Sequence, residues 1–160
     1  MLSRESTSNI LRTAERARLD VLQLYGRFTA EDCAEIRQEF DGQLWFVIGV
    51  DENTAAIPAH WRELADSADA LVLDTSVRGR TGGTGRAFNW SSVMEEVGEM
   101  SLEIPVVLAG GLTAENVSSA IATLHPAVVD ISSGVESAPG VKSHERMTAF
   151  AREVLSASIV

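Results

Sequence analysis

Asp74 is the first candidate for chemistry, because it directly follows the short apolar run of residues 70–73. A carboxylate at the end of a buried strand loses part of its solvation, which raises its pKa and suits it to general acid catalysis. An aspartate in this place can also cap the turn after the strand. Position alone leaves both interpretations open.

Two later segments, residues 109–113 and 132–136, join an apolar run to a following segment through small residues. Those small residues are Gly110, Gly111, Ser132, Ser133 and Gly134. Small residues expose backbone N–H groups, and the start of a helix favours an anion. Two consecutive loops of this kind form the usual phosphate site of a β/α barrel, so phosphate binding is favoured over two simple tight turns.

The longest loop, residues 76–88, contains the glycine-rich stretch Gly82-Gly83-Thr84-Gly85. Glycines let a loop bend over a ligand, and a long loop inside a compact domain is often a lid or a binding loop. Glycines alone fit a solvent-facing loop better. The lid is therefore a hypothesis that needs further context.

The remaining reactive side chains give no cofactor or metal site. His60, His125 and His144 fall at helix ends, where surface positions are expected, and their spacing suits no metal. Cys33 falls on the apolar face of a helix, which predicts a small buried thiol. We therefore expect no cofactor and no metal.

The candidate site residues are positioned by short apolar runs that alternate with helical segments along one domain, residues 1–160. Five apolar runs rich in Val, Ile and Leu predict buried parallel strands: 21–24, 44–50, 70–73, 105–109 and 127–132. Helical spacing predicts six helices: 8–18, 30–40, 58–65, 89–100, 114–124 and 144–156. A helix followed by five strand–helix units fits either a doubly wound sheet or part of a (β/α)8 barrel. The pattern alone favours the open sheet, because a whole barrel needs about 250 residues.

Charge and composition limit the classes of partner that this chain can bind. The chain has 160 residues and a formal net charge of −10 with no basic patch, which argues against nucleic acid. No apolar run is long enough to span a bilayer, so no membrane contact is expected. A single cysteine excludes an internal disulfide. A cytoplasmic protein is the simple expectation.

Several motifs, taken in order, resemble the phosphoribosylanthranilate isomerase family of tryptophan biosynthesis. They are residues 20–26 (DVLQLYG), 71–75 (LVLDT), 82–90 (GGTGRAFNW), 105–112 (PVVLAGGL), 116–117 (NV), 129–136 (VDISSGVE) and 139–142 (PGVK). The likeness covers essentially the whole chain. A related isomerase of the histidine pathway fits less well, because the surroundings of Asp74 and of Gly83-Thr84-Gly85 match the tryptophan enzyme better.

The resemblance implies a partial (β/α)8 TIM barrel made of about five C-terminal β/α units preceded by a helix. It implies an Amadori rearrangement of N-(5-phosphoribosyl)anthranilate to the 1-deoxyribulose 5-phosphate derivative, with Asp74 as the general acid. Gly110, Gly111, Ser132, Ser133 and Gly134 would hold the phosphate of this aminosugar. Asp130 would orient the sugar, and the loop of Gly83, Thr84 and Gly85 would close over it.

The chain also departs from the family pattern. The Lys-x-Cys-Gly segment that supplies the base, and the arginine that faces the anthranilate carboxylate, have no counterpart, so an N-terminally truncated barrel is implied. Tyr25 stands where the family has histidine, and Asn89 where it has aspartate. Activity would then be impaired, and a non-catalytic phosphate-sugar binding or assembly module is the alternative. Open sheet edges near Val21 and Val129 predict a homo-oligomer, or complementation by an N-terminal barrel segment.

Overall fold

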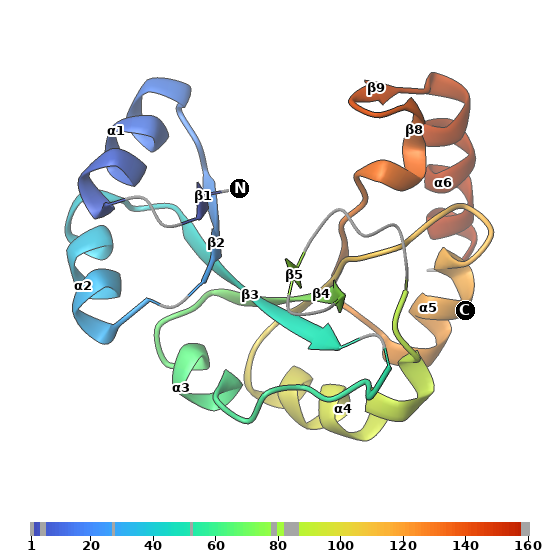
Figure 1. The fold of residues 1–160 in the computed structure, drawn as a ribbon, viewed down its shortest axis with the longest axis horizontal. Coiled ribbons are helices and arrows are strands. Elements are labelled where there is room, and N and C mark those ends of the chain that lie inside the picture. Colours follow the sequence, from blue (N-terminus) through green and yellow to red (C-terminus); the bar gives the residue numbers. More distant parts are fainter. Residues whose placement is uncertain are drawn as a thin grey trace.

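The structure, a computed structural model, describes residues 2–3, 6–26, 28–51, 53–77, 80–81 and 87–157. Helices line the outside of a curved sheet, and the chain follows an arc from α1 (Thr7–Ala17) to the hairpin of β8 (Glu136–Ala138) and β9 (Val141–Lys142) (Figure 1). The two ends of the arc face each other across an opening (Figure 1). The described residues therefore form an open segment of a barrel wall.

The parallel strands are β1 (Leu2–Ser3), β2 (Val21–Tyr25), β3 (Gln43–Asp51), β4 (Ala70–Val77), β6 (Val106–Leu108) and β7 (Val128–Val129). Their order in the sheet is β1-β2-β3-β4-β6-β7, which is also their order along the chain. A doubly wound sheet reverses direction at a switch point, whereas a barrel adds each strand beside the last. The partial barrel is confirmed, and the preference for an open doubly wound sheet drawn from pattern alone was wrong.

The helices are α1 (Thr7–Ala17), α2 (Ala30–Glu39), α3 (Trp61–Ala65), α4 (Met94–Glu103), α5 (Val117–Leu124) and α6 (His144–Ala157). Two short 3-10 helices are η1 (Trp90–Val93) and η2 (Ser133–Val135). All six predicted helices are present, although α3 and α5 each begin later than predicted and α4 begins at Met94, after η1, instead of at residue 89. The start of α2 follows from its sequence, because the Thr29 hydroxyl accepts from the Asp32 N–H and the Asp32 carboxylate accepts from the Thr29 N–H.

The two faces of the sheet bury different residues. Leu71 and Leu73 of β4 point outward into the large core shared with all six helices. Ala70 and Val72 alternate with them and point inward, where they pack in a small cluster with Val107 of β6 and with Ala109, which follows that strand. This alternation is the period-two pattern of a strand, and it fixes which side chains face the barrel interior.

Four short strands were not predicted. β1 adds a strand ahead of α1 and pairs with Leu24 and Tyr25 of β2. β5 (Arg80–Thr81) pairs antiparallel with β4, and β8 (Glu136–Ala138) pairs antiparallel with β9 (Val141–Lys142). The predicted open edge at β2 is therefore partly covered by β1, which corrects that expectation. β7 pairs with β6 alone among the described strands.

Candidate active site

Asp74 lies inside β4, which continues to Val77, and it is the register partner of Gly49 of β3. It is two residues beyond Val72 in the same strand, so its side chain shares the inner face of the sheet with Ala70 and Val72. The residue is only 4% exposed. The expected strand of residues 70–73 was too short, so Asp74 lies inside β4 and does not follow it. The nearly buried carboxyl group is in the carboxyl-terminal half of the strand, toward the end where β/α barrels carry their sites.

The Asp74 carboxyl group accepts a hydrogen bond from the side chain of Tyr25. The Tyr25 hydroxyl donates a hydrogen bond to Asp74 Oδ2 at 3.2 Å. Burial raises the pKa of Asp74 above its ordinary value; hydrogen bonds from Tyr25 and from the Thr75 backbone lower it, and the charge of Asp130 raises it. Burial also raises the pKa of Tyr25, as does the neighbouring charge of Asp74, so Tyr25 stays a protonated donor.

Asp130 directly follows β7 and faces the same interior. Its backbone N–H donates to the Leu108 carbonyl at 2.9 Å, which continues the ladder from β6. Its Oδ2 accepts a hydrogen bond of 3.5 Å from Gln23 Nε2, across 107 residues of sequence. Gln23 and Tyr25 on β2, Asp74 on β4 and Asp130 after β7 therefore form one polar group, which we call the interior cluster.

Gly110 fits tightly against the acid. Its backbone has φ of +83°, and a Cβ there would lie 2.4 Å from the Thr75 nitrogen and 2.6 Å from Asp74 Oδ1. Distances this short leave no room for a side chain. Gly110 thus lets the loop after β6 approach the carboxyl group of Asp74 directly.

The loop after β7 in turn lies against the loop after β6. A Cβ at Gly134 would lie 2.0 Å from the Leu112 carbonyl oxygen, so the two backbones are in close contact. Ser132 and Ser133 are exposed at the start of η2, and Gly111 also has positive φ, +66°. The five residues predicted to hold a phosphate therefore lie on two adjoining loops.

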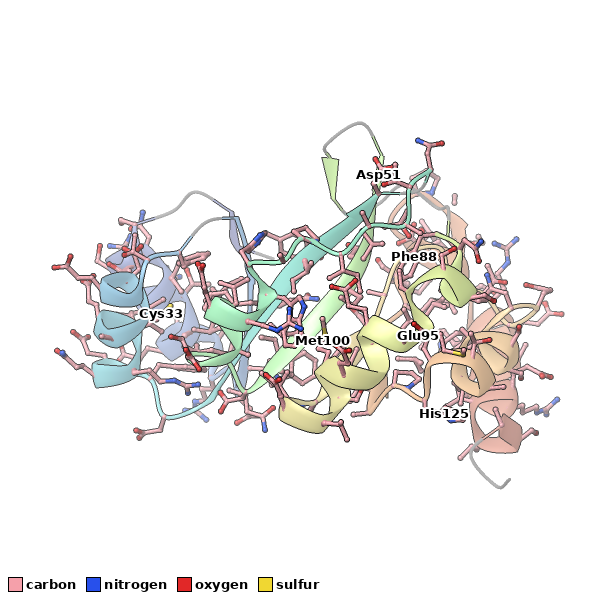
Figure 2. The ribbon with its side chains drawn as sticks, turned by 90° about the horizontal axis from the view of Figure 1, so that it is seen from below. Cys33, Asp51, Phe88, Glu95, Met100 and His125 are labelled. Atoms are coloured by element: carbon pink, nitrogen blue, oxygen red, sulfur yellow. The ribbon has the colours of Figure 1, made fainter. Side chains whose placement is uncertain are left out.

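Other predicted residues fall outside this cluster. Gly83, Thr84 and Gly85 lie outside the described residues. Cys33 is buried on α2 in the core between helices and sheet, as predicted, and burial raises the pKa of its thiol. Figure 2 shows Cys33 on α2, at the opposite side of the molecule from α5 and α6.

The three histidines are exposed at helix ends, as predicted. Figure 2 shows His125 at the end of the molecule opposite Asp51, which marks the carboxyl end of β3. Within the described ranges, no group of three or more His, Cys, Asp or Glu side chains could hold a metal ion. In the same ranges no helix is both long and apolar enough to cross a membrane.

Sequence reasoning did not assign a site role to Gln23 or Tyr25. Both occupy alternate positions of β2 that are only half-buried, between the buried Leu22 and Leu24. Polar side chains at alternate positions of a barrel strand point to the interior, and this pattern in the sequence could have indicated that both residues face the site. Their contacts with Asp130 and Asp74 span too much sequence for a local pattern to predict.

The fold and the interior cluster place the chain among β/α-barrel proteins whose site lies at the carboxyl ends of the strands. Residues 3–153 match the family described as N-(5'-phosphoribosyl)anthranilate (PRA) isomerase. The chain belongs to this family.

Curated relatives agree with this family. N-(5'-phosphoribosyl)anthranilate isomerase of Pseudomonas fluorescens strain Pf0-1 is 41% identical over 136 residues, which are 85% of this chain and 61% of the relative. The protein of the same name from Haloferax volcanii is 40% identical over 131 residues, which are 82% of this chain and 56% of the relative. The chain thus spans about three fifths of the length of these relatives.

Solved structures agree as well. Phosphoribosyl anthranilate isomerase of Thermotoga maritima superposes with a TM-score of 0.77 at 29% identity, covering 97% of this chain and 71% of that one. The Thermus thermophilus enzyme gives 0.75 at 31% identity, covering 96% and 70%. A third such structure, in complex with reduced 1-(o-carboxyphenylamino)-1-deoxyribulose 5-phosphate, gives 0.74 at 28% identity, covering 97% and 69%.

Proposed function

We propose that this chain carries the general acid and the phosphate loops of an N-(5'-phosphoribosyl)anthranilate isomerase of tryptophan biosynthesis. The observation that supports this most directly is the buried carboxyl group of Asp74 beside Gly110. Protonation of the furanose ring oxygen needs an acid that still holds its proton near neutral pH. Burial raises the pKa of Asp74, which favours that form.

The proposed reaction starts at Asp74. Its proton passes to the ring oxygen of N-(5-phosphoribosyl)anthranilate, the ring opens, and the nitrogen forms a Schiff base. Removal of the C2 proton then gives an enolamine, which tautomerises to the ketone. Asp130 lies across the interior from Asp74, where it can accept hydrogen bonds from sugar hydroxyls, and Gln23 holds it in place.

The phosphate of the substrate would bind the adjoining loops. Gly110 and Gly111 free the backbone for close approach, and the exposed hydroxyls of Ser132 and Ser133 are donors. Such loops position the reacting carbon by holding a group remote from it. The glycine-rich residues 83–85 are proposed as the lid.

The C2 proton needs a base that the described residues do not provide near Asp74. Cys33 cannot serve, because its thiol lies in the core on the outer face of the sheet. In the family, a Lys-x-Cys-Gly segment supplies this base. Turnover by this chain alone should therefore be lower by about 10²–10⁴-fold than with a positioned base.

The test is a fluorescence assay of N-(5'-phosphoribosyl)anthranilate consumption by the purified chain. Asp74→Asn should lower the remaining turnover by about 10²–10⁴-fold, because it removes the acid. Asp66→Asn is the matched control, since Asp66 is exposed after α3 and has no part in the cluster. Turnover that survives in Asp74→Asn would contradict the proposed role of the acid.

The alternative function is a binding or assembly module derived from the enzyme, and the burial of Cys33 favours it. That module would bind phosphorylated sugar without turnover. No turnover by the wild-type chain, together with ligand binding at the loops, would decide for the module. Turnover that depends on Asp74 would decide for the isomerase.

A further inference from the structure

The chain has a single lysine, Lys142, and it lies beside the proposed phosphate loops. It ends β9 of the β8–β9 hairpin, which directly follows η2. The hairpin folds back, and the Ser143 N–H donates to the Val135 carbonyl at 2.8 Å. A hairpin outside the barrel wall thus brings one cation back to the loop after β7.

Each of the three ammonium donors of Lys142 has an acceptor. Nζ donates to the Ser132 carbonyl oxygen at 2.9 Å, to Ser132 Oγ at 3.2 Å and to Glu136 Oε1 at 2.9 Å. An ammonium group has three N–H donors and no acceptor. Lys142 is therefore fully engaged, and it acts on a ligand through Ser132 rather than by direct contact.

Glu136 fixes the lysine from the other side. Its second oxygen accepts from the Gly140 N–H at 3.1 Å, which closes the hairpin turn, and Arg146 donates to its backbone carbonyl. The pKa of Glu136 is lowered by Lys142 and by the Gly140 N–H, so Glu136 stays ionised near neutral pH. The lysine is thereby held over Ser132.

The contact also orients the Ser132 hydroxyl. A serine hydroxyl has one donor hydrogen and two lone pairs. Because Nζ occupies one lone pair, the hydrogen must point away from Lys142, and the exposed side chain leaves it free for a ligand oxygen. Because the positively charged Lys142 donates to the same oxygen, the hydroxyl hydrogen of Ser132 becomes a stronger donor to an anion.

We propose that Lys142 is a positioning residue for the phosphate group: it fixes Ser132 so that the hydroxyl donates to a phosphate oxygen, and it supplies positive charge in a chain of net charge −10. This inference rests on the proposed function, because it assumes that the two loops bind phosphate. Lys142 itself touches neither the phosphate nor the reacting atoms.

Ribose 5-phosphate is the probe. Its titration is followed by NMR on the backbone amide signals of Gly110, Gly111, Ser133 and Gly134. Lys142→Met should weaken binding by about tenfold, the value of one charge-assisted hydrogen bond. Lys142→Arg should restore most of it. Arg152→Met on α6 is the matched control, because it removes one exposed positive charge away from the loop, and its affinity should match wild type.

A double-mutant cycle separates positioning from general stability. Ser132→Ala should weaken binding in the wild-type chain but much less in Lys142→Met, because both changes remove the same oriented donor. Additive losses would overturn the proposal. Acetylation of the folded wild-type chain, whose only lysine is Lys142, tests the same point without a folding step, and unchanged affinity afterwards would also overturn it.

The outcomes distinguish this inference from the proposed function. If ribose 5-phosphate moves the four amide signals equally in wild type and Lys142→Met, the phosphate loops are correct and the role of Lys142 is wrong. If the sugar phosphate moves none of them in the wild-type chain, the phosphate site fails and the inference fails with it.

Discussion

Tyr25 is one of the groups that set the pKa of Asp74. Its hydroxyl donates to Asp74 Oδ2, and a donor stabilises the ionised carboxylate. Burial acts in the opposite direction and is the larger effect, so the pKa of Asp74 stays above its ordinary value. The family has histidine at this position, and the tyrosine of this chain keeps a donor there that carries no charge of its own.

Tyr25→Phe should raise the pKa of Asp74 further, because it removes a bond that favours the charged form. Asp130→Asn should lower it, because it removes a neighbouring negative charge. Both shifts can be followed by the pH dependence of the Asp74 carboxyl carbon signal in NMR. A lower midpoint in Tyr25→Phe would mean that Asp74 is the donor and Tyr25 the acceptor.

At the scale of elements, the two loops proposed to bind the phosphate pack closely against their neighbours at two glycines. Gly110 lies against Thr75 and Asp74, and Gly134 lies against Leu112. The positions of these loops are therefore set by strands β4 and β6 and by η2. Glycine at these two places is therefore required by the packing of the loops.

Gly110→Ala should cost about 2–4 kcal/mol of unfolding free energy, since it adds a clash to a positive-φ strain. Gly98→Ala is the matched control, because Gly98 lies in α4 with open space around its Cβ position. That change should stabilise the chain by about 0.5–1 kcal/mol. Chemical denaturation measures both, and equal stability of the two variants would contradict the close packing of Gly110.

How far the sequence predicts these elements depends on how local their causes are. The face on which Asp74 lies was predictable, because strand alternation from residues 70–73 sets it. The end of the strand was not, because β4 continues through polar residues to Val77. β1 was not, because a two-residue strand has no pattern of its own. The contact of Lys142 with Ser132 could not be predicted either, since it depends on a hairpin that turns at Gly140, where φ is +78°.

The strand order also needed more than pattern. Strand–helix alternation is the same in a doubly wound sheet and in a barrel, and only the order of the strands distinguishes them. The family motifs supplied that distinction, because they fix the chain to one fold. Within the described residues, the cluster of Ala70, Val72 and Val107 gives the physical reason: an inner face of small and branched residues is filled by strands, not by helices.

At the scale of the whole molecule, the described wall of the barrel is open, and its interior is incompletely filled. Val128 on the edge strand β7 is 41% exposed. An open hollow of about 380 Å³ lies along the inner face, and its lining includes Val21, Gln23, Trp45 and Asp130. Unpaired edges and exposed apolar interior are templates for association.

We therefore predict that this chain, on its own, pairs with a second copy. Val128→Lys should weaken the pairing, because a lysine on an edge strand opposes further strand addition. Leu102→Lys is the matched control: Leu102 is 89% exposed on α4, on the outer helix layer. Sedimentation velocity over a wide range of concentrations measures the effect. A monodisperse monomer at every concentration would contradict the prediction, and so would an equal effect of the two lysines. The N-terminal segment of a full-length relative would occupy the same strand edges and the same interior as the second copy. Adding that segment should therefore both displace the second copy and raise turnover.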